Sequence, residues 1–363
     1  MNRPRVLLLN QFLPPDPAPT ARLAADLMAG IPEVEWVPVG SGRDYRRGWR
    51  GGVVRRLGEE WGDLQRMRAR AEREVGVSGM VVFSSPPMLL AEVAGVARRL
   101  GVPLHHWVLD LYPDVAVALG QVPALVGRWF AGRMRAGFQA CATVTGVDEA
   151  MAERVEMVYG KACGVCRPWP ERVEEEPFAG WEGVPEGAPV WLYSGNLGRA
   201  HVWSSLVLIQ AELERRGAPW WLVVQGGGSG WEALRREVAR RALKQVATVP
   251  YAAAGQVAGA IRRALVGVAT QREALRGMLW PSKVGALAEE ARAVLWLGPA
   301  LEGGSNPLRF REGVGAFGSG EIEPVVSGLE RIRAEPPPGQ SGLANRIGLR
   351  EAGLAYWRRI LLR

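Results

Sequence analysis

The sequence has few of the residues that hold metal ions in proteins. Three cysteines and three histidines occur among 363 residues. Cys163 and Cys166 have the spacing of half a zinc site, but no second pair of cysteines and no nearby histidine completes it. We therefore expect buried thiols at these positions, no bound metal and no other cofactor.

Long apolar runs are also missing. The apolar run that follows Met1 ends at Asn10, which makes it too brief for a signal peptide. No other segment reaches the roughly 20 consecutive apolar residues that a membrane-spanning helix needs. We expect a cytoplasmic protein, and contact with the inner face of the plasma membrane is a further expectation that depends on the basic stretch described below.

Acidic residues are outnumbered by basic ones. The net charge is +8 and the isoelectric point is near 9.9. Such a balance suits nucleic acid, an anionic membrane surface or small anionic substrates. No nucleic-acid-binding signature accompanies the arginines, so we expect no nucleic-acid partner and favour membranes and phosphate ligands.

Length and apolar content predict two domains. The chain has 363 residues, of which 48% are hydrophobic, and this is enough to fill two cores. Short apolar runs alternate with helical patterns in both halves, which is typical of parallel α/β sheets. We predict strands at 5–12, 34–39, 80–83, 103–109, 142–147, 190–196, 220–225, 246–250, 265–270 and 292–298. An acidic segment rich in Pro and Gly, 170–189, is typical of an interdomain linker.

The turn after the run 190–193 carries the strongest functional signal. Gly195 and Asn196 break the strand, and Arg199 and His201 precede an apolar helical pattern. Such a turn lies at the carboxyl end of a strand, where ligands bind, and a helix start favours an anion. We predict a phosphate site here; the alternative is a tight connection with incidental polar residues.

A second signal precedes the helical pattern that begins near residue 283. Pro281 suits the first helical turn, Ser282 is a predicted cap, and Lys283 would stand at the positive helix end. The chain has three lysines, so a lysine at this place is not expected to be a generic solubilising charge. A run of glycines, Gly226, Gly227 and Gly228, offers backbone to a base or ribose, or is a flexible turn.

Polar residues in the first half also follow predicted strands. Asp110 and Asp114 come after the run 103–109 and would position sugar hydroxyls or take a proton, although Asp114 also suits a helix cap. Thr20 is a predicted N-cap after a Pro-rich segment. In the basic stretch from residue 41 to 56, arginines alternate with aromatic residues, as suits an anionic bilayer, or a solvated loop. The predicted membrane patch is Arg46, Arg47, Trp49 and Arg50.

Six motifs, taken in order, resemble glycosyltransferase family 4, in the subgroup that builds cell-surface polysaccharides and lipid-linked sugars. They are Pro14–Asp16, Ser84–Pro87, Trp107–Asp114, Tyr193–His201, Val223–Gly228 and Pro281–Lys283. The resemblance covers nearly the whole chain and weakens after about residue 300. It implies the GT-B arrangement, in which two Rossmann-like domains face each other across a cleft. The expected parts are an acceptor-binding domain (1–169), the linker (170–189), a nucleotide-sugar-binding domain (190–340) and a last helix (341–363) that packs back on the first domain.

The resemblance also implies a reaction. A nucleotide diphosphate-sugar, most often a UDP-sugar, gives its sugar to a sugar, lipid-linked or small-molecule acceptor with retention of the anomeric configuration. The implied diphosphate-binding residues are Asn196, Arg199, His201, Ser282 and Lys283; the nucleoside-binding ones are Gly195 and Gly226 to Gly228; the catalytic ones are Asp110, Arg199 and Lys283; the acceptor side has Asp16, Thr20, Ser85 and Asp114. Arg199, His201 and Lys283 would neutralise the departing diphosphate without a metal.

The chain departs from the wider family at two places. Leu109 stands where many members have a histidine, and Ala286 stands where many have a glutamate. Two alternatives therefore stay open. One is a degenerate relative that binds a nucleotide and transfers nothing, and the other is a sugar-nucleotide epimerase of the same fold.

Overall fold

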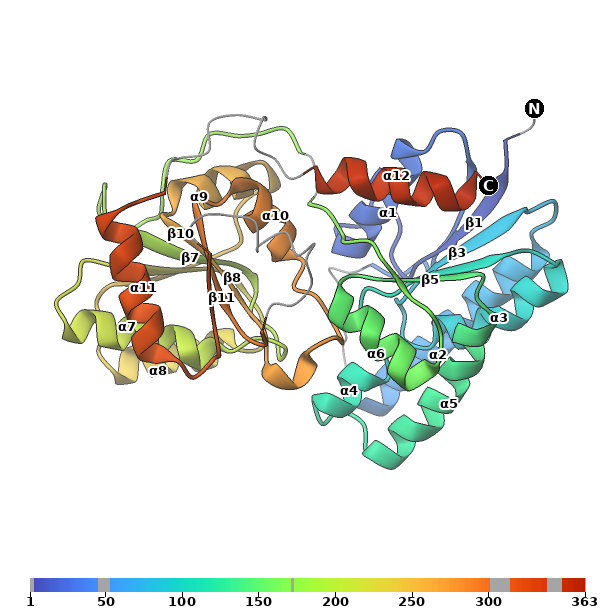
Figure 1. Ribbon diagram of the computed structural model, residues 1–363, viewed down its shortest axis with the longest axis horizontal. Helices are drawn as coiled ribbons and strands as arrows, with labels where there is room; N and C mark the ends of the chain where they lie inside the picture. Colours follow the sequence, from blue (N-terminus) through green and yellow to red (C-terminus); the bar gives the residue numbers. More distant parts are fainter. Residues whose placement is uncertain (1–2, 45–52, 171–172, 301–313, 338–347, 363) are drawn as a thin grey trace. The chain divides into compact units, whose positions relative to one another are not determined.

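The computed structural model describes residues 3–44, 53–170, 173–300, 314–337 and 348–362. The chain divides into two compact units (Figure 1). The first unit contains Met1–Glu171, Gly277–Trp280 and Gly348–Arg363, and the second contains Arg172–Arg276 and Pro281–Ile347. Both units place helices on the faces of a parallel sheet, as apolar strands buried on both sides require.

The sheet of the first unit has six parallel strands in the order β2-β1-β3-β4-β5-β6. The strands are β1 (Arg5–Leu9), β2 (Glu35–Val39), β3 (Gly79–Phe83), β4 (Leu104–Trp107), β5 (Thr143–Gly146) and β6 (Gly164–Val165). The helices are α1 (Pro19–Gly30), α2 (Val53–Arg73), α3 (Leu89–Leu100), α4 (Asp114–Ala118), α5 (Ala124–Ala140), α6 (Glu149–Tyr159) and α12 (Leu349–Leu361). The strand order reverses between β1 and β3, which is where an open parallel sheet forms a ligand crevice.

Helix α12 supplies part of the first unit's core. Leu354 and Trp357 are buried in one apolar cluster with residues of β1, β3 and α1. The ring of Trp357 lies 5.1 Å from that of Trp107 on β4. Asp26 on α1 accepts hydrogen bonds from Arg350 at 2.6 and 2.9 Å, which ties the start of α12 to α1. The last helix is therefore integral to this unit.

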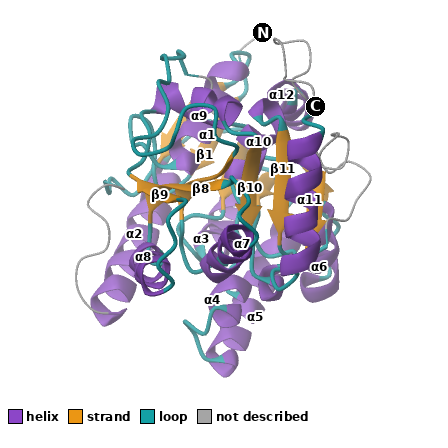
Figure 2. Cartoon of the chain, turned by 90° about the vertical axis from the view of Figure 1, so that its left-hand side faces the viewer, coloured by secondary structure: helices purple, strands orange, loops and turns teal. Residues whose placement is uncertain are grey.

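The second sheet also has six parallel strands, in the order β12-β11-β10-β7-β8-β9. The strands are β7 (Val190–Asn196), β8 (Trp221–Gly227), β9 (Val246–Val249), β10 (Val266–Thr270), β11 (Ala293–Leu297) and β12 (Val314–Phe317). The helices are α7 (Trp203–Arg215), α8 (Trp231–Arg240), α9 (Val257–Arg263), α10 (Lys283–Glu290) and α11 (Ile322–Ala334), with short 3₁₀ turns at Ala254–Gln256 and Glu273–Leu275. Figure 2 shows α7 and α11 on one face of these strands and α9 and α10 on the other. Here the order reverses between β7 and β10.

The segment 173–189 contains no helix or strand and packs on the second unit. Trp181 is buried, and its indole donates a hydrogen bond of 2.9 Å to Gln225 on β8. The backbone of Glu176 donates to the carbonyl of Gly255 at 3.0 Å. These contacts give this Pro- and Gly-rich segment a defined path along the unit.

The predicted fold class, α/β with two Rossmann-like parallel sheets, is confirmed. One local prediction is wrong. The strand predicted over 5–12 ends at Leu9, and beyond it the backbone of Gln11 donates to the carbonyl of Ser85, which follows β3.

Candidate functional site

The turn after β7 lies at the switch point of the second sheet. Strand β7 has β8 on one side and β10 on the other, so its carboxyl end opens where the strand order reverses. The turn reaches β10 through His201, whose Nδ1 lies 2.6 Å from the carbonyl oxygen of Thr270. The backbone N–H of Val202 donates to the Thr270 hydroxyl at 3.2 Å. The predicted phosphate turn is therefore fixed at the place where such sheets bind ligands.

The glycines beside this turn are required by close backbone packing. Gly226 has φ +142°, and a Cβ atom on it would lie 2.2 Å from the carbonyl oxygen of Gly195 on the paired strand. Gly228 has φ +114°, and a Cβ there would lie 2.2 Å from Asn196 Oδ1. Leu197 donates a backbone hydrogen bond of 2.6 Å to Gly227. The two strand ends thus approach more closely than side chains permit, whether or not a nucleoside lies on them.

Lys283 reaches this turn from the start of α10. Its Nζ donates a hydrogen bond of 2.6 Å to the hydroxyl of Tyr193 and lies 3.8 Å from the centre of that ring. Its Cε passes over Gly195, where a Cβ would come within 3.3 Å. The Tyr193 hydroxyl in turn donates to the carbonyl of Asn196 at 2.9 Å. Tyr193 therefore connects the lysine to the turn.

The ammonium of Lys283 is poorly solvated although part of its side chain is exposed. Desolvation lowers the pKa of Lys283 to about 7. Near neutral pH, Lys283 is therefore only partly protonated, and an anion beside it would favour the protonated form.

His201 is neutral in this environment. Burial and the charge of Lys283 lower its pKa to about 3. Because Nδ1 faces the Thr270 carbonyl, the proton of the neutral ring belongs on Nδ1, and Nε2 is left as an acceptor. His201 is thus uncharged in the free protein, and its contact with a diphosphate stays a prediction. Its Nε2 is suited to accept a hydrogen bond from a hydroxyl group.

The other predicted diphosphate residues lie on the surface of the second unit. The side chains of Asn196, Arg199 and Ser282 are all exposed. Ser282 occupies the N-cap position of α10, but its side chain accepts no capping hydrogen bond, because its own backbone is already helical with φ −55° and ψ −27°. The predicted Ser282 cap is thus wrong, and its hydroxyl is open to solvent.

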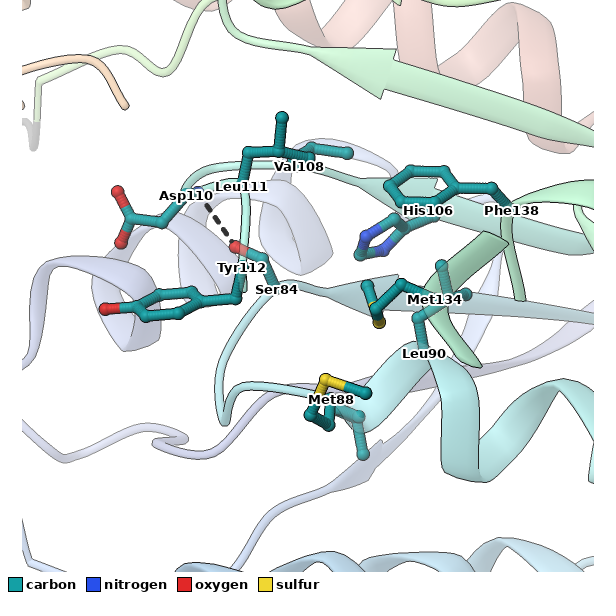
Figure 3. Close-up of a pocket in the computed structure, with 11 residues that line it drawn as sticks. Ser84, Met88, Leu90, His106, Val108, Asp110, Leu111, Tyr112, Met134 and Phe138 are labelled. Carbon is teal, nitrogen blue, oxygen red and sulfur yellow. Dashed lines mark hydrogen bonds between the residues drawn. The ribbon is translucent and has the colours of Figure 1, made fainter. Parts of the chain in front are cut away.

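In the first unit, Asp110 stands at the rim of a small pocket (Figure 3). Its backbone N–H donates to Ser84 Oγ at 3.0 Å, and its carboxylate points away from the apolar wall formed by Met134 and Phe138. The side chain of Asp110 is exposed, and partial desolvation by the surrounding protein raises its pKa above the ordinary value. An exposed carboxylate with a raised pKa is suited to accept a proton.

His106 forms the floor of the same pocket. Its Nδ1 lies 2.8 Å from the carbonyl oxygen of Val82, and its Nε2 is buried without a hydrogen-bond partner among the described residues. The space beside it, about 10 Å³, accommodates one water-sized group. Neighbouring His105 faces the opposite way and contacts Thr143 at 2.8 Å. Burial lowers the pKa of both histidines to about 4.

Ser85 lies at the switch point of the first sheet. Its hydroxyl donates to Gln11 Oε1 at 3.0 Å, and its carbonyl accepts from the backbone of Gln11 at 2.8 Å. Asp16 accepts a hydrogen bond from Ala18 at 2.8 Å, just before α1. Thr20 lies inside α1, because the helix begins at Pro19, which suits a first helical position. The predicted Thr20 cap is therefore wrong.

Asp114 holds two elements together. One carboxylate oxygen accepts from Arg154 at 2.8 Å, and the other accepts from the Tyr159 hydroxyl at 2.5 Å. It is the first residue of α4, and its side chain makes no cap. The predicted Asp114 cap is wrong because α6 uses both oxygens. Its role toward an acceptor stays a prediction.

Other predicted features give no further site. Arg46, Arg47, Trp49 and Arg50 lie outside the described residues. Cys163 and Cys166 are free thiols, and burial raises the pKa of each to about 12. Within the described ranges, no three acidic, histidine or cysteine side chains gather as metal ligands would. Among the same residues, no helix combines the length and apolar character needed to cross a membrane.

Comparison with known proteins identifies the fold. No protein-family model matches the chain, and no curated protein matches its sequence. Sucrose-phosphate synthase from Thermosynechococcus elongatus is similar in structure, with 15% identity, TM-score 0.62 and coverage of 99% of this chain and 97% of that one. HepE from Anabaena, solved in complex with UDP-glucose, has 13% identity, TM-score 0.60 and coverage of 99% and 98%. The lipopolysaccharide outer core galactosyltransferase WaaB has 11% identity, TM-score 0.61 and coverage of 99% and 98%.

The shared feature is the GT-B fold. At sequence identities of 11 to 15%, the similarity shows a shared fold and nothing more specific. Membership of family 4 stays a prediction from the six motifs.

Sequence reasoning missed several residues of the two sites. Tyr193 was read as the end of a buried strand, yet it contacts Lys283. The sequence did not mark His106 or Gln11 as functional. His106 is a single residue within a strand, and Gln11 follows a short strand. Only the parallel register brings Gln11 beside Ser85.

Proposed function

We propose that this protein is a glycosyltransferase that uses a nucleotide diphosphate-sugar donor. The observation that carries the proposal is the turn at the switch point of the second sheet, with Lys283 held over Gly195 by Tyr193. Two features support a nucleotide-sugar there: exposed backbone at a strand end and a cation at a helix start. The fold also supports a nucleotide-sugar donor, since HepE, which has the same fold, was solved with UDP-glucose.

We further propose a UDP-sugar as donor, a lipid-linked or saccharide acceptor of cell-surface polysaccharide or glycolipid synthesis, and retention of the anomeric configuration. These finer points come from the motif resemblance. The absence of a metal and contact with the inner face of a membrane are also proposals.

In the proposed step, the bond between the sugar's anomeric carbon and the donor phosphate oxygen breaks, and the acceptor hydroxyl oxygen forms a bond to that carbon. Negative charge grows on the departing diphosphate, where Lys283 and Arg199 supply positive charge. The acceptor hydroxyl loses its proton to a base, for which we propose Asp110 from the motif resemblance. Its raised pKa favours proton uptake.

The test is a panel of nucleotide-sugars, read by thermal stabilisation and by chromatography of the products. We expect one UDP-sugar to raise the melting temperature and to be hydrolysed slowly without an acceptor. A donor at about 100 times its dissociation constant adds roughly 2.7 kcal/mol to the free energy of unfolding. Lys283→Met should lose this stabilisation. Lys244→Met is its matched control, because Lys244 is exposed on the same unit.

Each alternative has its own result in this test. Binding without hydrolysis, and without transfer to any acceptor offered, would indicate a nucleotide-binding protein. Interconversion of the sugar while it stays on the nucleotide would indicate an epimerase. Stabilisation by no nucleotide-sugar would contradict the proposal.

A further inference from the structure

A long part of the first unit carries positive charge only. From residue 115 to 147 the sequence has three arginines, Arg128, Arg133 and Arg135, and no Asp or Glu. This stretch includes most of α4 and all of α5. A surface built from it attracts anions without local compensation along the chain.

The start of α5 exposes large apolar side chains. Leu125 is 70% exposed, Trp129 is 60% exposed and Val126 is 44% exposed. Leu125 and Trp129 are four residues apart, so they share one face of the helix. Figure 1 shows α4 and this end of α5 at an outlying end of the unit. Large apolar side chains grouped at an exposed tip mark an interaction surface.

The opposite face of α5 explains why these side chains cannot turn inward. Gly127 and Gly137 face the protein, and a Cβ on Gly127 would lie 2.3 Å from Val117 on α4, while one on Gly137 would lie 2.9 Å from Leu90 on α3. Helix α5 is thus fixed by close helix contacts through its small residues. Its rotation is set, and Leu125 and Trp129 are presented to the outside.

Two arginines lie beside the exposed apolar residues. Arg128 is exposed and forms no ion pair with a described residue. The guanidinium of Arg133 lies 5.4 Å from the centre of the Trp129 ring, on the same helix face. Arg133 pairs with Glu92 at 2.6 Å, and this carboxylate is buried, so it adds little negative charge to the surface. The outward charge of the tip remains positive.

We propose that the tip of α5, formed by Leu125, Val126, Arg128 and Trp129, docks on an anionic lipid bilayer. A bilayer interface takes apolar side chains into its acyl boundary, Trp at the headgroup level and arginines against acidic headgroups. The tip offers these three kinds of group and no acid. It differs from the predicted patch around Trp49. This inference gives the membrane contact proposed above a defined site, and it does not depend on the proposed enzymatic activity.

The test is cosedimentation of the full chain with vesicles of phosphatidylcholine alone or with 30% phosphatidylglycerol. We expect binding to the acidic vesicles at 50 mM salt and a loss of tenfold or more at 500 mM, because the screening length falls below about 5 Å. Trp129→Ser with Leu125→Ser should weaken binding by about tenfold or more, as their apolar area stays in water. Arg128→Ser should weaken it by about fivefold.

The matched control is Met157→Ser on α6. Met157 is 82% exposed on the same unit but lies away from this tip in sequence and on another helix. Its vesicle binding should equal that of the wild type. Circular dichroism of each variant checks that the fold is kept, and the substituted side chains are exposed, so unfolding is not expected.

Four results would overturn the proposal. The first is no binding to acidic vesicles at low salt. The second is equal binding to neutral and acidic vesicles. The third is unchanged binding of the Trp129 and Leu125 double variant, which would move the contact elsewhere on the chain. Self-association of the wild type that the double variant lacks, without vesicle binding, would assign the tip to a protein interface instead.

Discussion

Replacing Lys283 by Ala removes a cation that the structure holds directly against the glycine turn. The lysine lies 3.8 Å above the Tyr193 ring and donates to its hydroxyl at 2.6 Å. A donor diphosphate at this turn would gain one charge-assisted hydrogen bond from its Nζ, worth about 1.5–3 kcal/mol. We therefore expect donor affinity to fall by about ten- to 150-fold.

The pH dependence of binding gives a sharper readout than affinity alone. The free protein holds Lys283 with a pKa of about 7, and bound phosphate favours its protonated form. Donor affinity should therefore be greatest below pH 7 and should fall as the pH rises above 7, by at most tenfold per pH unit. Lys283→Met keeps an apolar stem over the ring and should lose this slope.

The assay is isothermal titration of the donor found in the panel, at pH 6, 7, 8 and 9. Lys283→Arg should recover part of the affinity and flatten the profile, because a guanidinium stays charged throughout. Lys244→Ala should behave as the wild type. If Lys283→Ala binds the donor as tightly as the wild type at every pH, the turn at β7 is not the diphosphate site.

Three further predictions follow from packing and burial. Gly228→Ala should cost about 1–3 kcal/mol of stability and abolish donor binding, because φ +114° disfavours a side chain and the Cβ would meet Asn196 Oδ1 at 2.2 Å; melting temperature and titration check both. Trp357→Ala should cost about 3–5 kcal/mol in urea unfolding, because its ring is fully buried, and a loss under 1 kcal/mol would contradict its role in the core. His106 has a folded pKa of about 4, below its ordinary 6.5, so the unfolded chain binds its proton first and stability falls as the pH drops from 6.5 toward 4. From pH 7 to pH 5 this amounts to about 2 kcal/mol, and urea unfolding of His106→Phe should show an acid loss smaller by that amount.

Sequence patterns were sufficient for ten of the twelve strands and for the turn at the end of β7, but they did not predict β6 or β12. Strands such as β7 and β10 are buried on both faces, so each reads as an unbroken apolar run between polar turns. The turn at Gly195 follows such a run, and the carboxyl end of a parallel strand is the same edge in every sheet of this kind.

What the sequence could not supply was contact between distant residues. Lys283 and Tyr193 are 90 positions apart, and their hydrogen bond depends on how α10 packs on β10 and β7. Asp114 was read as a local cap, but Arg154 and Tyr159, 40 and 45 residues away, occupy its oxygens. The charge of His201 depends on its burial and on the Thr270 carbonyl, neither of which has a sequence signature.

The position of α12 in the core of the first unit affects the order in which the two units can fold during synthesis. A ribosome releases the strands β1 to β6 early, but Leu354 and Trp357 emerge only after all of the second unit's strands. Until then, the apolar surface of α1 and of the ring of Trp107 has no cover from α12. The second unit can therefore complete its core first. The first unit keeps apolar surface exposed to chaperones and proteases until α12 has been synthesised.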